Sequence, residues 1–130
     1  TAIASFPRSV SGGRAVTRID VATRFNRALG IRYPSQGRWS GQEFRETILR
    51  AAVEEAIRDG ETVEVNFDGC IGLPTSFLEE AFGGLFRDHP EWTLEQVNGA
   101  LKIVAPMNKK LWPFIDMAKG YMRIAAADRT

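Results

Sequence analysis

The sequence is poor in the residues that build metal sites, disulfides and membrane spans. It contains one cysteine, Cys70, and one histidine, His89, among its 130 residues. A single cysteine excludes an internal disulfide and a cysteine-rich zinc site, and a single histidine excludes a multi-histidine metal centre. No apolar run approaches the ~20 residues of a membrane-spanning helix. We therefore expect no metal, no cofactor and no membrane insertion.

The first residues, TAIASFPRSVSGGRAV, also lack the apolar region of a secretory signal, and we expect a cytoplasmic protein. Hydrophobic residues make up 44% and charged residues 25% of the chain, which excludes a wholly disordered protein. A length of 130 residues corresponds to one domain that buries its own core.

The net charge is only +1, but the charges are segregated along the chain. Residues 1–34 carry +5, residues 35–100 carry −8 and residues 101–130 carry +4. Either the acids lie on solvated helix faces over which the basic ends fold back, or a partner recognises an acidic patch between basic ends. The basic residues are not interleaved with aromatic side chains, as they are on a platform for single-stranded nucleic acid, so we expect no nucleic-acid partner.

Three segments have the spacing of a capping box, in which a hydroxyl side chain and a Glu or Gln three residues later satisfy the first amides of a helix. They begin at Ser40, Ser76 and Thr93. The first predicts a helix over residues 41–59 that ends at Gly60. The second predicts a helix over 76–86 with Ser76 as its N-cap, and the third predicts a short helix that ends near residue 98.

Alternating apolar residues predict strands. Residues 61–68 (ETVEVNFD) place Val63, Val65 and Phe67 on one face. Residues 17–25 and 101–105 are further strands, although 21–25 could also be a helical turn. A last helix is expected from about residue 108 to 119. Strands that alternate with helices predict an α/β fold, with a mixed sheet of about four strands and helices mainly on one face.

The ends of the chain carry no such pattern. We interpret residues 1–15 as a flexible N-terminal tail, residues 16–123 as the domain, and residues 124–130 as a frayed C-terminus.

The stretch VEVNFDGCIGLPTSFLEEAFGGL, residues 63–85, resembles the central part of the STAS domain, the fold of the anti-sigma factor antagonists. The pattern there is a strand, a short loop and Asp-Ser-Ser-Gly-Leu at a helix start, which aligns with residues 74–78. The sequence is even more similar to a STAS-like family of unknown function in bacteria, through SGQEFRE at residues 40–46 and TSFLEEAFGGL at 75–85. The resemblance covers residues 17–120 and implies a STAS-like fold.

In the antagonists the first Ser of the motif is phosphorylated by an anti-sigma kinase, and the unmodified protein binds that kinase. The resemblance places this Ser on Thr75 and the second Ser on Ser76, although Pro74 and Phe77 replace the flanking Asp and Gly. It implies a regulatory protein-binding module, with Thr75 and Ser76 as candidate phospho-acceptors and a histidine-kinase-like ATPase as partner. Asp68, Gly72, Leu73, Pro74 and Arg32 are the candidate partner-binding residues; Arg32 could instead pair with an acid of the central segment.

The alternative is a structural or assembly domain that forms a homo-oligomer without a phospho-switch. Purely structural roles are also possible for the candidate residues: Ser76 as a helix cap and Asp68 as a turn residue. We interpret Cys70 as a small buried side chain and His89 as a solvated one. We expect no enzyme, because there is no Gly-x-Ser-x-Gly elbow and no phosphate-binding glycine loop followed by Lys-Ser/Thr.

Overall fold

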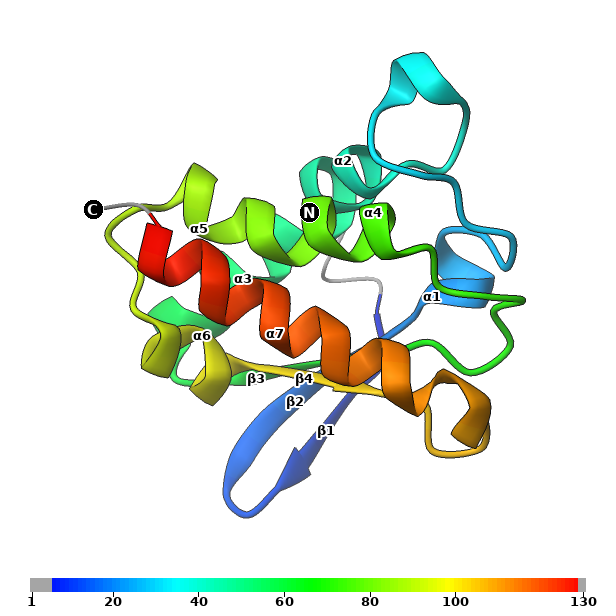
Figure 1. Cartoon of the computed structure of the whole chain (residues 1–130). Coiled ribbons are helices and arrows are strands. Elements are labelled where there is room, and N and C mark those ends of the chain that lie inside the picture. Colours follow the sequence, from blue (N-terminus) through cyan, green and yellow to red (C-terminus); the bar gives the residue numbers. More distant parts are fainter. Residues whose placement is uncertain (1–5, 129–130) are drawn as a thin grey trace.

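A four-stranded sheet lies at the centre of the computed structural model, which describes residues 6–128 (Figure 1). The strand order is β1-β2-β3-β4; β1 is antiparallel to β2, and β2, β3 and β4 are parallel. The strands are β1 (Arg8–Ser11), β2 (Arg14–Asp20), β3 (Thr62–Asn66) and β4 (Leu101–Val104). The predicted α/β fold with about four strands in a mixed sheet is confirmed.

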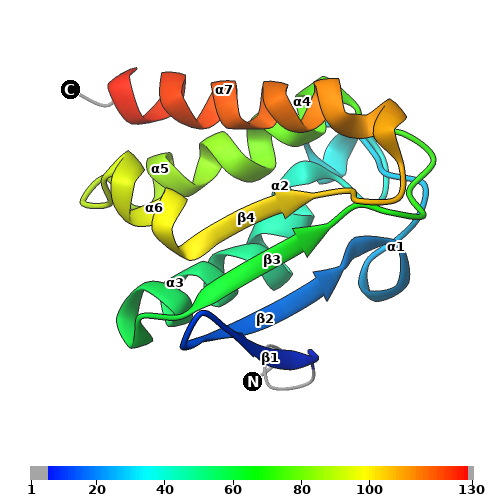
Figure 2. The ribbon, with the colours of Figure 1, turned by 90° about the horizontal axis from the view of Figure 1, so that it is seen from below.

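Helices fill both crossovers between the parallel strands. The first crossover holds α2 (Gly41–Phe44), the π turn η3 (Arg45–Leu49) and α3 (Arg50–Asp59). The second holds α4 (Thr75–Leu78), the π turn η4 (Glu79–Gly83), α5 (Gly84–Asp88) and α6 (Leu94–Ala100). The short α1 is Val21–Arg24, and α7 is Trp112–Asp128. Since parallel crossovers are right-handed and the strands follow one another in order, both sets of helices lie on the same face of the sheet (Figure 2).

The register of β3 places its apolar residues under these helices, as predicted. Val63, Val65 and Phe67 are at most 1% exposed, and the Phe67 ring meets Phe82 edge-on at 6.2 Å between centroids. On the opposite face Asn66 is buried at 2% exposure, but Thr62 and Glu64 are only half-buried, and no helix of residues 6–128 crosses this face. This alternation is the period of two that a sheet with one covered face requires.

The helix predicted over residues 41–59 is present, and its boundaries are confirmed. The Ser40 hydroxyl accepts the Glu43 amide at 3.1 Å, and Gly60 ends the helix in the left-handed conformation, with φ +67°. The Glu43 carboxylate does not reach back to the Ser40 amide but accepts the Trp39 N–H at 3.1 Å. The π turn η3 adds a residue to one turn, so the buried stripe continues at Ala52 and Val53 rather than Ala51.

Residues 75–88 form the second long helix, which lies in the middle of the core. Five of its apolar side chains are 0% exposed. They are Phe77, Leu78, Ala81, Phe82 and Leu85. The long α7 packs along this helix and mainly against η4 (Figure 1), so residues 75–88 are covered on one side by the sheet and on the other by α7.

The interpretation of residues 1–15 as a tail is wrong for the part that the structure describes; residues 1–5 lie outside it. Phe6 is buried, β1 pairs with β2, and the turn between them is Gly12-Gly13, with φ of +59° and +82°. Two left-handed residues are what a tight hairpin turn needs, and glycine adopts them without strain. The short edge strand escaped prediction because it carries too few apolar residues to show a period.

Two further boundaries differ from prediction. The strand predicted over 17–25 ends at Asp20, and the next residues form the short α1, the helical turn that the sequence left open. The last helix does not end near residue 119 or fray from residue 124, because α7 continues to Asp128 with Met122 and Ala125 buried. Residues 129–130 lie outside the described part of the chain.

Candidate functional site

The loop between β3 and α4 and the start of α4 lie at the carboxyl end of the parallel strands, where the sequence placed the candidate residues. Asp68 is the anchor of this loop. Its two carboxylate oxygens accept the Met107 N–H at 3.1 and 3.0 Å, and its own N–H donates to the Asn66 side chain at 2.8 Å. Asp68 thus ties the loop after β3 to the loop after β4. These contacts are those of a turn residue, which was one of the two interpretations of Asp68.

The prediction of Ser76 as an N-cap is wrong. The helix begins one residue earlier: Thr75 is its first residue, Pro74 is its N-cap, and the Leu78 N–H donates to the Pro74 carbonyl at 3.1 Å. A proline offers no side-chain acceptor, so no side chain caps this helix. The Glu79 carboxylate, which a capping box would turn back, is held by arginines instead. Ser76 is therefore an ordinary, half-buried residue of the first turn.

The Thr75 side chain is exposed, whereas the three residues before it are buried to different degrees. Leu73 is 3% exposed and belongs to the core, so its side chain is not part of an accessible surface, contrary to prediction. Gly72 and Pro74 are half-buried. Two apolar side chains near Asp68 are strongly exposed, Ile71 at 71% and Met107 at 87%. We call Ile71, Gly72, Thr75 and Met107 the α4 surface.

Arg32 pairs with acids of the central segment, which was one of its two predicted roles. Its Nη1 donates to Glu79 and lies 3.4 Å from the Glu80 carboxylate. Glu79 is also held by Arg87 at 2.8 and 3.1 Å. The hydrogen bond from Arg32 to Glu79 raises the arginine's pKa against its partial burial. For Glu79, burial raises the pKa, but the bonds from Arg87 and Arg32 outweigh it and leave the pKa below its ordinary value.

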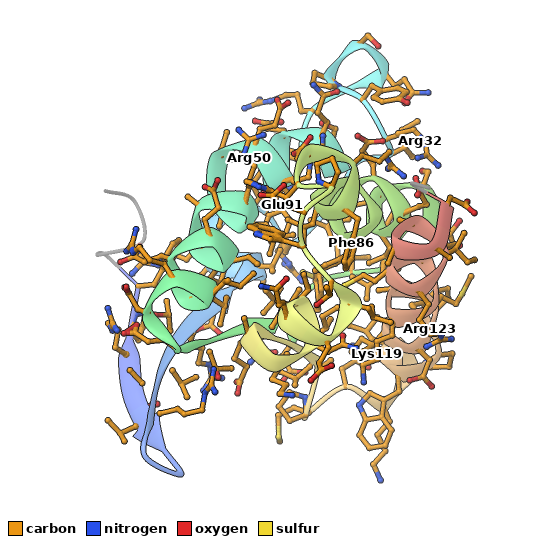
Figure 3. The ribbon with its side chains drawn as sticks, turned by 90° about the vertical axis from the view of Figure 1, so that its left-hand side faces the viewer. Arg32, Arg50, Phe86, Glu91, Lys119 and Arg123 are labelled. Atoms are coloured by element: carbon orange, nitrogen blue, oxygen red, sulfur yellow. The ribbon has the colours of Figure 1, made fainter. Side chains whose placement is uncertain are left out.

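A buried ion pair links the two long helices, and the sequence analysis did not identify it. Arg45, only 6% exposed, donates to the main-chain oxygen of Glu80 and to its carboxylate at 2.8 Å, and to Asp88 at 2.9 Å. Gly84 makes room for the guanidinium: a Cβ there would lie 2.6 Å from the arginine Cζ. We call Arg45, Glu80, Gly84 and Asp88 the arginine clamp. Arg50 extends it with a 3.1 Å bond to Asp88, and Arg32 lies 3.4 Å from the Glu80 carboxylate; Figure 3 labels both arginines.

The clamp gives a structural reason for the two motifs that carry the resemblance. SGQEFRE supplies Gly41 and Arg45, and TSFLEEAFGGL supplies Glu80 and Gly84. A Cβ on Gly41 would lie 2.5 Å from the Phe77 carbonyl oxygen, so this glycine lets the two helices approach closely. The signal that could have revealed the clamp is an arginine at a buried position of the first helix, together with an acid in the second helix that has glycines three and four residues after it.

The surroundings of Cys70 and His89 are those of residues that support the fold, not of reactive groups. Burial raises the pKa of the Cys70 thiol to about 11, which keeps it protonated and unreactive at neutral pH. His89 is not simply solvated: it stacks on Trp92 at 3.8 Å and bonds Glu54 and Glu91 at 2.9 and 2.7 Å. Residues 6–128 hold no cluster of three or more His, Cys, Asp or Glu side chains that could bind a metal ion. No helix in this part of the chain is long and apolar enough to span a bilayer.

Comparison with known proteins places the chain in a family. No curated protein and no solved structure matches the chain significantly. One family model does match, over residues 40–108, which is more than half of the chain. The matched segment runs from the cap of α2 through β3 and the 75–88 helix to the loop after β4, and it contains the whole arginine clamp and the α4 surface. The chain therefore belongs to the family of STAS-like domains of unknown function (DUF4325).

Proposed function

We propose that this STAS-like domain is a non-catalytic regulatory module that binds a protein partner through the α4 surface. The observation that carries the proposal is the exposure of the Thr75 side chain at the first helical residue, after a loop that exposes Ile71 and that Asp68 ties to the exposed Met107. Exposed apolar side chains are what a protein partner can bury on contact. The supporting argument from the family is that the related antagonists use the same helix start.

Phosphorylation of Thr75 is the regulatory step in this proposal. The first three N–H groups of a helix have no partner within it, so those of residues 75–77 can stabilise a phosphoryl group. Repulsion by the neighbouring acids is reduced, because Glu79 and Glu80 are each paired with arginines. Thr75 and Glu79 are four residues apart on one helix face, so the phosphoryl group could compete with Glu79 for Arg32. An addition of roughly −1.5 to −2 charges at Thr75 would then release a partner from the surface.

The proposed partner is an ATPase that resembles a histidine kinase, since such proteins bind and phosphorylate the antagonists to which the family is related. We propose no catalytic role for Ser76 and His89. Ser76 lies in the first turn of the 75–88 helix and His89 follows its last turn, which places them about 20 Å apart. They cannot form a nucleophile–base pair.

The experiment is affinity capture with the tagged chain from its source organism, followed by binding measurements with the purified partner. Thr75→Glu should weaken binding about tenfold or more, since a charge placed in a contact mainly affects the complex. Thr75→Ala should bind like the parent and resist phosphorylation by the partner and ATP. Ser35→Glu is the matched control, because Ser35 is also exposed but lies in the short 3₁₀ helix η2 (Pro34–Gln36) that precedes α2. All variants should keep the parent's melting temperature.

The proposed release of the partner by phosphorylation is wrong if Thr75→Glu binds as tightly as the parent and mass spectrometry of the native protein finds no phosphate on Thr75 or Ser76. A static binding module would then remain if alanine at Ile71 or Met107 still weakens capture. If Thr75→Glu, Ile71→Ala and Met107→Ala all bind the partner as tightly as the parent, the α4 surface is not the contact.

A second candidate is a self-associating assembly domain, favoured by the open face of the sheet. Arg18, Glu64 and Lys102 stand in register across β2, β3 and β4 on this face, so positive and negative charges alternate across it. Analytical ultracentrifugation tests this candidate: a dimer that dissociates in high salt and on Glu64→Lys supports it, and a monomer at all concentrations excludes it.

A further inference from the structure

The edge of the sheet formed by β4 faces a groove whose other wall is α7. Two hollows of about 350 and 320 Å³ adjoin there and share Ile103, Val104 and Lys119 in their linings. Among residues 6–128, the strand order leaves β4 paired on one side only, with β3. The groove therefore runs along an unpaired strand edge.

The main-chain groups of Ile103 point into this groove. The Val104 carbonyl accepts the Phe67 N–H at 2.9 Å, so the peptide groups of Val104 face β3. Successive residues of a strand direct their peptide groups to opposite sides, which turns those of Ile103 and Ala105 toward the groove. The Ala105 carbonyl is occupied, because it accepts the Trp112 indole N–H at 2.9 Å. Within residues 6–128, the N–H and C=O of Ile103 have no hydrogen-bond partner on the groove side.

The groove is also basic. Lys102 lies on β4, and Lys119 and Arg123 lie one turn apart on α7, where that helix runs beside α6 (Figure 3). The part of the chain that the structure describes offers none of these three a carboxylate within ion-pair distance. Asp116 is the one acidic side chain in the lining of the two hollows. Three cations thus flank a strand edge that has open hydrogen-bonding groups and an apolar floor.

We propose that the β4 edge binds an extended acidic segment of a partner protein, which adds a fifth strand to the sheet. The N–H and C=O of Ile103 would pair with the main chain of the segment, and its carboxylates would meet Lys102, Lys119 and Arg123. This is recognition by strand addition, in which the main chain contributes affinity and alternate side chains contribute specificity. A second copy of this chain is the poorer occupant, because pairing two β4 edges would bring the same cations together. The site is independent of the α4 surface and of any modification of Thr75.

The test uses the full chain and a fluorescein-labelled peptide of about eight residues in which Glu alternates with Val. Anisotropy should report saturable binding that weakens with added salt, and a peptide with Lys in place of Glu should not bind. Amide hydrogen exchange at Ile103 should slow on saturation, as expected for a new ladder bond. Lys119→Glu/Arg123→Glu should weaken binding about tenfold or more. The control Arg27→Glu/Lys110→Glu reverses two exposed cations outside the groove and should bind like the parent.

Several results would overturn the proposal. These are equal binding of the acidic and basic peptides, no binding of the acidic peptide at millimolar concentration, unchanged exchange at Ile103, or equal loss in the two double variants. Binding of a single-stranded oligonucleotide at the same cations, without binding of the acidic peptide, would assign the groove to another class of partner and equally reject the proposal.

Discussion

At the scale of single residues, Phe82 shows how the core depends on the middle of the 75–88 helix. Its side chain is 0% exposed and lies between the sheet, through Phe67, and the α7 helix that covers η4. The sheet and α7 each pack against other parts of the core as well. They could therefore not move together to fill the cavity that loss of the Phe82 ring would leave.

Phe82→Ala should lower the free energy of unfolding by about 3–5 kcal/mol, since it removes buried apolar surface and leaves a cavity. Urea unfolding followed by circular dichroism measures this. Phe114→Ala is the control, because Phe114 is 36% exposed on α7 and its truncation should have a much smaller effect. Equal midpoints for Phe82→Ala and the parent would contradict the packing described here.

Cys70 gives a prediction that depends on pH. Because burial raises its pKa to about 11, the unfolded chain loses the thiol proton at lower pH than the folded chain does. The thiol's contribution to stability is therefore fully present below its ordinary pKa and is lost as the pH rises toward 11.

Folded protein at pH 8 should react with a disulfide reagent far more slowly than protein in urea. Cys70→Ala should remove the corresponding part of the stability loss at alkaline pH, relative to the parent measured at the same pH. Rapid labelling of the folded parent would show that the thiol is accessible.

At the scale of elements, the arginine clamp joins the two long helices at their π turns. Arg45 begins η3, Glu80 lies in η4, and Gly84 follows η4 directly. A buried charge whose partner is removed is strongly destabilising, so the clamp makes the relative position of the helices depend on a few side chains. The α4 surface lies at the N-terminal end of one of these helices, and the clamp therefore also positions Thr75.

Gly84→Ala should destabilise the fold by about 1–3 kcal/mol, although alanine favours a helix by about 1 kcal/mol more than glycine does. The reason is that the added Cβ displaces a guanidinium that is buried and bonded to Glu80 and Asp88. Gly99→Ala in α6 is the matched control: nothing lies within 4 Å of its Cβ, so the propensity gain should appear alone. Thermal melting of both variants tests the pair, and stabilisation by Gly84→Ala would disprove the clamp's packing.

At the scale of the whole molecule, the segregated charges are partly reunited by the fold. Arg8 of β1 bonds the Glu61 carboxylate at 2.6 Å, and Arg14 donates to the Glu61 and Gly99 carbonyls. Together with Arg32 on Glu79, these contacts bring the basic N-terminal segment back over the acidic middle. The basic C-terminal segment instead leaves Lys119 and Arg123 along the groove beside β4.

Removal of residues 1–12 should lower the melting temperature by about 5–10 °C, because it takes away Phe6 and the β1 ladder. It should also promote self-association, since the edge of β2 would be unpaired. Melting and size-exclusion chromatography of the truncated and full chains provide the measurement. A truncation without effect would restore the interpretation of this segment as a tail.

The local pattern alone determined the elements whose signals are contained in a few neighbouring residues. Ser40 and Gly60 bound the first long helix, the alternation around Val63 set the buried face of β3, and Thr93 with Gln96 formed the predicted capping box at α6. The family motifs also identified the STAS-like fold. These features could be read from the sequence because their geometry depends on spacing within one helix or strand.

Tertiary contacts decided the rest. The N-terminal strand exists because β2 offers it an edge, and Glu79 does not complete a capping box because arginines distant in sequence hold it. Arg45 is buried because Glu80, Asp88 and the missing side chain of Gly84 accommodate it, and the groove at β4 exists because α7 packs on another helix. Each outcome depends on residues tens of positions apart, whose energies enter only after the chain has brought them together.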